Sequence, residues 1–305
     1  MKKNLLNLLI NLVLTNIFIF IFLYSNNIKN SVIVAINIWK NILIPNIFPF
    51  LLISSLMVKY GLINIISKTI GPLIKKIYNL PQSSSYAILT SIITGFPTGS
   101  IYIKDLLNNK EIDIDDANSL IAFTSYSNPI FVISGIGETL LNNKKIGIKI
   151  YIVHLTTGLI MGLFFRNKNK KSKDTKYKII VDNKSFINNL TDSINNTFKV
   201  LINILGIIIF FYMIVTIINI IFPNNIYTSI IKGILELTTG ISNISSLKIA
   251  KKLKIALIGF LISFNGLSVH FQTKSIIEKT GIKYKNYFIS RIIQSLLCFI
   301  ILYIF

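Results

Sequence analysis

Long apolar runs separated by short polar segments dominate the hydrophobic pattern of this chain. Residues 200–222 contain no charged residue, and this run exceeds the roughly 20 apolar residues that a membrane-spanning helix needs. Other apolar runs are predicted to be helices at residues 5–24, 31–43, 47–58, 148–165 and 287–305. The pattern therefore predicts an all-α, polytopic integral membrane protein.

Two apolar stretches are interrupted near their centres. The motif Thr94-Gly-Phe-Pro-Thr-Gly-Ser100 separates two arms that are each too short to span a bilayer. A Gly-containing break at residues 262–272 lies between similar arms. Irregular backbone at membrane depth is tolerated only where it is buried in protein or lines a cavity. We therefore predict re-entrant hairpins at residues 83–109 and 250–278, with tips that meet near mid-membrane.

A discontinuous helix is expected after the first hairpin. Asp113 is a suitable N-cap for a helix running to residue 141. The segment Phe123-Thr-Ser-Tyr-Ser-Asn-Pro129 should interrupt it, because Pro129 lacks an amide donor and restricts Asn128. Three further segments have apolar residues at helical spacing and are predicted to be amphipathic helices, at residues 62–80, 186–199 and 226–239.

The order of these elements suggests an internal repeat. Phe96 matches Phe264 and Ser100 matches Ser268 at an offset of 168 residues (264 − 96 = 268 − 100), although chance similarity between two Ile-rich stretches is the alternative. Counting crossings predicts two inverted repeats, each with a re-entrant hairpin and a discontinuous helix. The expected regions are a first helix at 1–27, one repeat at 28–141, a linking helix and basic loop at 142–184, and a second repeat at 185–305.

The charge pattern predicts orientation. The net charge is +21, and residues 166–184 hold eight basic and two acidic residues. Basic loops favour the cytoplasmic side, so we expect this loop and both termini to be cytoplasmic. The remaining lysines are spread along the chain, and we expect no nucleic-acid partner.

Enzymatic and metal chemistry are not expected. Cys298 is the single cysteine, and neither His154 nor His270 has a carboxylate cluster nearby in the sequence. No nucleophile–base pair, phosphate loop or dinucleotide fingerprint is present. We predict no cofactor and leave a coupling ion or proton open, with Glu138 and Glu236 as its candidate partners.

The candidate substrate-binding residues lie at the breaks. Half-helix N-termini offer free amides and a positive dipole end, which favour an anion. Arg291 lies within an apolar run, and a charged residue at membrane depth is costly, so it is a candidate for a functional residue. Each kind of candidate also has a structural explanation. The glycine breaks could be simple tight turns, and the polar residues before Pro129 could bond the carbonyls that it frees. The His could link two helices by a hydrogen bond, and the Arg could extend to the membrane interface. The candidates are Thr98, Gly99, Ser100, Ser125, Ser127, Asn128, Asn265, Gly266, Ser268, His270, Gln272 and Arg291.

Three segments together resemble a known family. Gly95-Phe-Pro-Thr-Gly99, residues 123–131 and Phe264-Asn-Gly-Leu-Ser-Val-His-Phe-Gln272 are similar to sporulation integral membrane proteins of the YlbJ type, which carry the nucleoside-recognition, or Gate, domain. This family commonly has a Gly pair where the chain has Asn265-Gly266.

The resemblance implies an architecture related to concentrative nucleoside transporters. It also implies a link to spore maturation and to dipicolinate transport across the outer forespore membrane. We therefore expect a transporter of a small anionic metabolite in the cell membrane or outer forespore membrane, in contact with the lipid bilayer. Nucleoside transport and a non-transporting scaffold for spore-cortex assembly are the alternatives, and a homo-oligomer is left open. A scaffold has no use for paired re-entrant hairpins.

Overall fold

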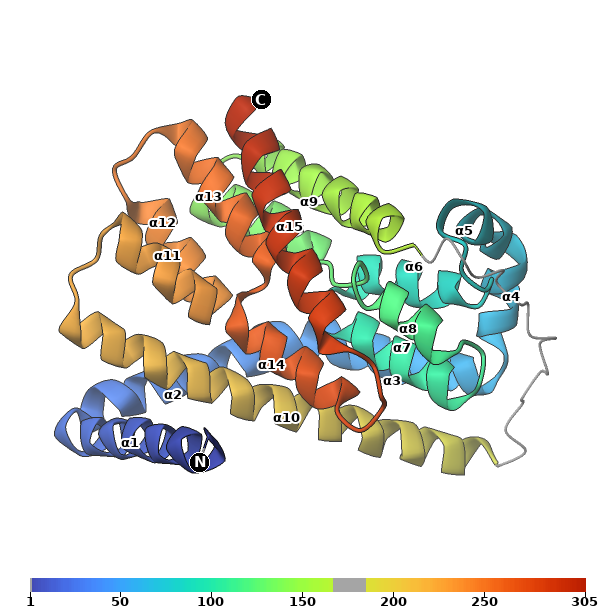
Figure 1. Cartoon of the computed structure of the whole chain (residues 1–305), viewed down its shortest axis with the longest axis horizontal. Coiled ribbons are helices and arrows are strands. Elements are labelled where there is room, and N and C mark those ends of the chain that lie inside the picture. Colours follow the sequence, from blue (N-terminus) through green and yellow to red (C-terminus); the bar gives the residue numbers. More distant parts are fainter. Residues whose placement is uncertain (1, 167–184) are drawn as a thin grey trace.

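The computed structural model describes residues 2–166 and 185–305, and Figure 1 shows a bundle of helices with no strand among these residues. The predicted all-α class is confirmed. Four segments are long and apolar enough to cross a membrane: α9 (Lys144–Phe164), α10 (Phe186–Ile221), Lys251–Ile277 and α15 (Tyr284–Ile304). The chain is therefore an integral membrane protein.

The N-terminal helices lie beside α10. Helix α1 (Lys2–Leu23) meets α2 (Ser25–Ile38) at an angle of 101°, and residues 7–41 count as a fifth span if the bent pair crosses as one. A short π-helix, η1 (Trp39–Leu43), leads into α3 (Ile44–Lys59), and α2 and α3 both pack on α10. The apolar part of α3, Phe48–Met57, is shorter than a span, so the crossing expected at residues 47–58 is not supported.

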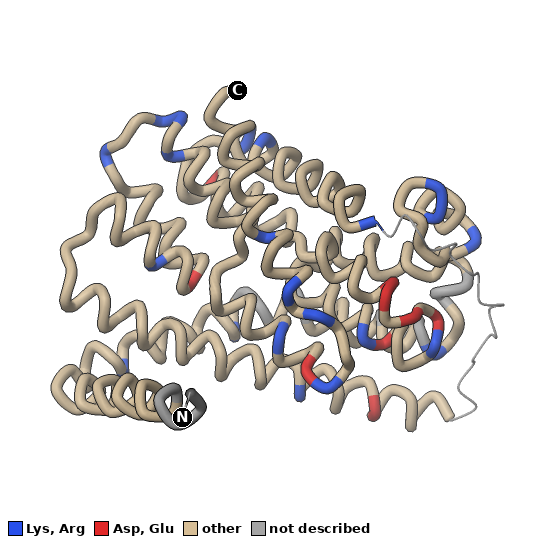
Figure 2. The backbone as a smooth tube through the Cα atoms, in the orientation of Figure 1, with Lys and Arg blue, Asp and Glu red and all other residues tan. Residues whose placement is uncertain are grey.

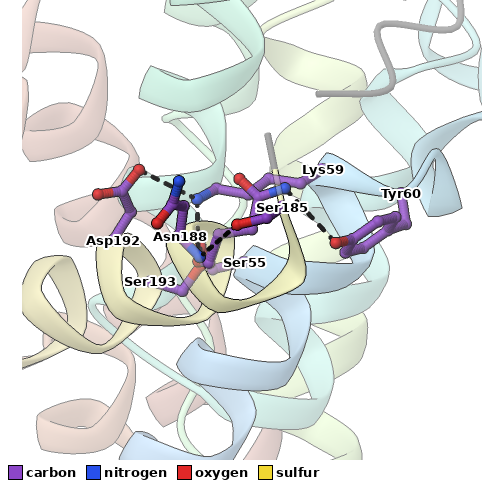
Figure 3. A network of polar contacts seen from close by, with 8 residues as sticks. Ser55, Lys59, Tyr60, Ser185, Asn188, Asp192 and Ser193 are labelled. Carbon is purple, nitrogen blue, oxygen red and sulfur yellow. Dashed lines mark hydrogen bonds and ion pairs between the residues drawn. The ribbon is translucent and has the colours of Figure 1, made fainter. Parts of the chain in front are cut away.

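A polar cluster joins the end of α3 to the first turns of α10 (Figure 3). The Ser55 hydroxyl donates to the Ser193 hydroxyl at 3.0 Å, and the Lys59 ammonium donates to the Asn189 carbonyl oxygen at 3.1 Å. Lys59 also lies 4.0 Å from the Asp192 carboxylate. These contacts hold α3 against α10, and α10 also forms part of the wall of the cavity described below.

Two of the expected amphipathic segments are each divided into two helices. Residues 62–80 form α4 (Leu62–Thr69) and α5 (Gly71–Tyr78), because Pro72 cannot donate an amide and disfavours a continuous helix. Residues 226–239 fall in α11 (Ile226–Leu235) and α12 (Leu237–Ser246), which are separated by Glu236 in an extended conformation. Residues 186–199 are simply the start of α10.

Two pairs of helices form hairpins. In the first, α6 (Ser84–Thr94) and α7 (Thr98–Asn108) pack side by side, and the Ser83 hydroxyl donates to the Glu111 carbonyl oxygen at 3.0 Å across the open end. In the second, α11 and α12 pack so closely that a Cβ on Gly240 would overlap Gly233. The second hairpin is therefore residues 226–246.

The hairpin predicted at residues 250–278 is wrong. There, α13 (Lys251–Phe264) and α14 (Gly266–Ile277) follow one another as a single candidate span of 27 residues, broken at Asn265. They do not fold back on each other, and their packing differs. Helix α13 packs mainly on α15, whereas α14 packs mainly on α10 and α7 (Figure 1).

The discontinuous helix predicted after the first hairpin is confirmed. The Asp113 carboxylate accepts the amides of Asp115 and Asp116, both at 3.0 Å, and caps α8 (Ile114–Leu120). Residues 124–128 are non-helical, and the chain then forms the π-helix η2 (Phe131–Leu140). π-Helical segments are rare and are often found at functional sites.

The order of hairpin, broken helix and spanning helix occurs twice. Helices α9 and α15 have 21 residues each, and both their starts and their ends are 140 positions apart (284 − 144 = 304 − 164). The structural offset is thus 140. The predicted offset of 168 is wrong, because it pairs the first hairpin with the second broken helix. In Figure 1, α9 and α15 run in opposite directions where they cross.

Charged residues gather near helix ends and connections (Figure 2). Most of α1 and the C-terminal half of α10 carry none, and α1 exposes large apolar side chains, including Leu8, Phe18 and Phe22. These surfaces imply contact with the lipid bilayer. The basic loop lies outside the described residues except for Arg166.

Candidate functional site

A cavity of about 480 Å³ lies where the interrupted helices meet. Its wall includes the tip of the α6–α7 hairpin, the break before η2, the tip of the α11–α12 hairpin and the first turn of α14. Helix α10 contributes Ile204, Ile208 and Tyr212. The volume lies within the range of sites that bind small molecules.

The first hairpin brings its tip to the cavity through a close approach at Gly99. A Cβ there would overlap the Thr124 carbonyl oxygen, so only glycine lets α7 contact the neighbouring break. Thr94, Phe96 and Pro97 then line the cavity. Thr98 bonds through its hydroxyl to Thr94 and to the Gly95 carbonyl oxygen, so its side chain stabilises the tip. Ser100 similarly donates to the Pro97 carbonyl oxygen at 2.6 Å.

Asn128 ends the first break, and the helical segment that follows it leads into η2. The Asn128 side-chain oxygen accepts the amides of Ile130 at 2.8 Å and Phe131 at 3.4 Å at the start of that segment. Asn128 also lines the cavity, together with Ile130, Phe131, Gly135 and Thr139. Both functions considered for Asn128, satisfying the broken backbone and facing a ligand, are therefore geometrically compatible.

The second break turns at Asn265 and Gly266, which have φ values of 77° and 65°. Glycine and asparagine tolerate this left-handed region better than other residues do. The Asn265 amide donates to the Ser125 hydroxyl at 2.7 Å and so joins the two breaks. Ser268 in the first turn of α14 and Gln272 one turn later line the cavity.

The tip of the second hairpin places a carboxylate in the cavity wall. One oxygen of Glu236 accepts the Thr238 hydroxyl at 2.7 Å, the Thr239 amide at 2.8 Å and the Thr239 hydroxyl at 3.0 Å. The Tyr212 hydroxyl is 2.6 Å from that of Thr238. Glu236 is only 4% exposed, and its cap fixes the start of α12.

Arg291 does not line the cavity. Its guanidinium is fully buried and donates to the carbonyl oxygens of Ser125 at 2.9 Å and Ala122 at 2.8 Å. The Tyr287 ring lies 5.6 Å away. Among the described residues no acid pairs with Arg291. The sequence suggested that Arg291 either faces the cavity or lies at the membrane interface. In the structure it does neither, because it binds the carbonyl oxygens of the first break.

The two histidines also form hydrogen bonds with backbone groups at the helix breaks. His154 Nε2 accepts the Ser127 amide at 3.0 Å, and its Nδ1 lies 2.9 Å from the Ser263 hydroxyl. Gln294 on α15 donates to the His154 carbonyl oxygen at 2.9 Å. His270 lies 2.9 Å from the Phe264 carbonyl oxygen and 2.7 Å from the Tyr284 hydroxyl. Both rings are buried, and neither lines the cavity.

The predicted residues therefore separate into two groups. Three line the cavity, namely Asn128, Ser268 and Gln272. The others stabilise the tips and breaks around it: Thr98, Gly99, Ser100, Ser125, Ser127, Asn265, Gly266, His270 and Arg291.

The sequence reading missed several residues of the cavity wall. Tyr212 and Thr238 have no local signal, because one lies inside a long apolar helix and the other follows a turn without Gly or Pro. Glu236 was recognised as an acid in an apolar region. Glu138, the other candidate, lies at the end of η2, where it is exposed and 2.9 Å from Lys144.

The electrostatics of the cavity combine positive helix ends with one acid. Pro97, Ile130 and Glu236 are the N-cap residues of α7, η2 and α12, and Ser268 lies in the first turn of α14. Each N-terminus carries a partial positive charge. The residues that line the cavity include no Lys, Arg or His.

Comparisons with known proteins identify similar sequences. Residues 42–141 match the family model Gate, described as nucleoside recognition. The chain is 21% identical over 270 residues to the sporulation integral membrane protein YlbJ of Bacillus subtilis (strain 168), and the alignment covers 76% of this chain and 66% of that protein. No solved structure gives a significant match. The resemblance seen in the three motifs is confirmed.

Proposed function

We propose that this protein is a membrane transporter of a small anionic metabolite during sporulation, and that its cargo is dipicolinate. The cavity between the two hairpin tips and the two helix breaks is the observation that carries the proposal. Discontinuous helices are the usual binding elements of secondary transporters, because their unpaired backbone groups can bind cargo at membrane depth. A scaffold would not require such a cavity.

The helix ends support an anionic cargo. Four N-terminal ends border the cavity, and each one favours negative charge. Asn128, Ser268 and Gln272 add side-chain donors, while Phe131, Ile204 and Ile208 offer apolar surface to a planar ring. Dipicolinate, an aromatic dicarboxylate, has complementary chemistry. Arg291 contributes indirectly, by positioning the break that presents Asn128.

The sporulation role is proposed from the relative named above, which is described as a sporulation integral membrane protein, and the outer forespore membrane is proposed from the family resemblance of the three motifs. Inverted repeats that move past each other would expose this central cavity alternately to the two sides. We include that movement in the proposal because the cavity lies between the two repeats.

A nucleoside is the second candidate cargo. The matching family model is described as nucleoside recognition, and Glu236, Asn128 and Gln272 could accept and donate the hydrogen bonds of a sugar and base. A neutral nucleoside would also avoid repulsion by Glu236. The two cargoes can be distinguished directly.

The test is counterflow in liposomes that contain the purified full chain. We expect external radiolabelled dipicolinate to exchange with internal dipicolinate, and unlabelled uridine not to compete. Ser268→Ala should weaken dipicolinate binding by about 2- to 10-fold, the usual effect of losing one hydrogen bond. Ser242→Ala, on the exposed side of α12, is the matched control. Exchange of uridine but not dipicolinate would favour the nucleoside function, and exchange of neither would reject both.

A further inference from the structure

We propose that Glu236 is a cation-coupling site, at which the carboxylate takes up one monovalent cation, either a proton or an alkali ion, that accompanies the cargo. The coupling rests on the proposed transport function. Cation uptake by Glu236 does not, because it can occur without cargo.

One oxygen of the Glu236 carboxylate is available for this purpose. All three hydrogen bonds of the side chain go to Oε2. Among the described residues Oε1 has no hydrogen-bond donor, and it is not one of the enclosed, partnerless atoms. Glu236 lines the cavity, and we infer that Oε1 is the oxygen that it presents there. The cap of α12 can therefore persist while Oε1 binds a cation.

Within the described residues no ion pair involves this carboxylate. Lys232 lies one turn earlier on α11 and is itself buried, and no ion pair joins it to Glu236. Tyr212 on α10 lies against the same carboxylate and 2.6 Å from the Thr238 hydroxyl that donates to it, but its phenol carries no positive charge. Lys254 on α13 donates instead to the Ser245 carbonyl oxygen at 2.7 Å. An unpaired carboxylate in a largely apolar cavity is costly, and a proton or alkali ion would remove that cost.

The remaining ionisable groups on neighbouring elements point elsewhere. On α14, His270 contacts Tyr284 and the Phe264 carbonyl oxygen, and on η2, Glu138 pairs with Lys144. Tyr212 and Glu236 are the ionisable side chains that line the cavity. Glu236 is therefore the group whose charge a cation would change.

The internal repeat indicates that the hairpin fold does not require this carboxylate. At the offset of 140, Glu236 corresponds to Phe96, and Thr238 corresponds to Thr98 (236 − 96 = 238 − 98). The first hairpin thus forms its tip with an apolar side chain at the same place. Helix N-caps, moreover, are usually Ser, Thr, Asp or Asn. A Glu at this tip therefore suits a binding function in addition to its cap of α12.

Cation binding would also resolve a conflict within the cavity. An anionic cargo and an ionised Glu236 would repel each other, whereas a bound cation makes the carboxylate neutral. The cation would then enter and leave together with the anion. This gives a transporter a way to use an ion gradient.

The first experiment measures cation binding without cargo. Infrared difference spectra of the purified full chain should show a protonated-carboxyl band on acidification if the ion is a proton. Saturable binding of radioactive sodium should appear if it is an alkali ion. Glu236→Gln should abolish the sodium signal, or remove one buried carboxyl's component from the carboxyl band, to which the other acids of the chain also contribute. Glu138→Gln, which removes an exposed acid, should leave the sodium signal or that component intact. Absence of both signals, or their persistence in Glu236→Gln, would overturn the inference.

The second experiment tests coupling. Wild-type liposomes should accumulate dipicolinate when the identified ion gradient is imposed. Glu236→Gln should lose gradient-driven accumulation, because its amide cannot take up the cation, and any dipicolinate counterflow that it shows should not respond to the imposed gradient. Accumulation that is unchanged in Glu236→Gln would refute coupling. A wild-type protein that binds the cation at Glu236 but exchanges no dipicolinate would instead refute the proposed cargo.

Discussion

At the scale of single residues, buried polar side chains mainly stabilise the interrupted backbone. Arg291 binds two carbonyl oxygens, His154 accepts one amide, and Asn265 joins the two breaks through Ser125. Buried polar backbone groups are costly when unpaired, so each break requires such partners. The sequence identified these residues as special, but it could not distinguish a side chain that binds cargo from one that binds backbone.

Arg291 gives a direct test of this distinction. Arg291→Lys should lower the stability of the purified protein, because one ammonium cannot reproduce two guanidinium bonds. Hydrogen bonds to charged groups contribute about 1.5–3 kcal/mol each, so the thermal midpoint in detergent should fall measurably. We expect binding of anionic and neutral ligands to weaken equally. Selective loss of anion binding would mean that Arg291 contacts the cargo after all.

Two helical glycines provide a matched pair. Gly99→Ala should disrupt the first hairpin, because its Cβ would overlap the Thr124 backbone. Gly206→Ala meets no atom within 4 Å and should stabilise α10 by about 0.5–1 kcal/mol, the usual gain from Gly to Ala within a helix. The yield of folded protein and its thermal midpoint would measure both effects. A neutral Gly99→Ala would show that α7 does not need this close approach.

At the scale of elements, the sequence predicted some breaks better than others. The first hairpin has a Gly and a Pro at its tip, and the first broken helix has Asp113 and Pro129, so local chemistry marked both. The second hairpin has its glycines inside the helices, at the Gly233–Gly240 contact, and a Glu at its tip. No local rule marks such a turn, and packing between α11 and α12 determines it. The same long-range packing makes residues 251–277 a broken span.

The two hairpin tips should respond together to cargo. In a Cys298→Ser background, single cysteines at Phe96 and Thr238 line the cavity from opposite hairpins. Bound dipicolinate should slow the reaction of both with a small thiol reagent, because it occupies the space between them. A cysteine at Ser246, exposed at the other end of α12, should react at an unchanged rate. Protection of only one tip would show that the hairpins do not share a binding site.

At the scale of the whole molecule, the corrected hairpin changes the expected orientation of the C-terminus. Three candidate spans follow residues 166–184: α10, the broken segment Lys251–Ile277 and α15. If each crosses once and the α11–α12 hairpin re-enters from one side, the C-terminus lies on the face opposite the basic loop. Both cannot then be cytoplasmic, as the sequence suggested. We retain the cytoplasmic loop, because basic residues favour that side, and assign the C-terminus to the outer face.

Inverted repeats make a further prediction about two corresponding positions. Asn108 at the end of α7 and Lys248 after α12 are 140 residues apart and exposed, and inversion would place them on opposite faces. In a Cys298→Ser background, cysteines at Ser172 and Asn108 should resist an impermeant thiol reagent added to intact cells. Cysteines at Lys248 and Phe305 should react, and all four should react after the membrane is opened. Labelling of Asn108→Cys and Lys248→Cys from the same side would exclude inversion. Labelling of Ser172→Cys with protection of Phe305→Cys would keep the inverted fold but reverse its orientation in the membrane.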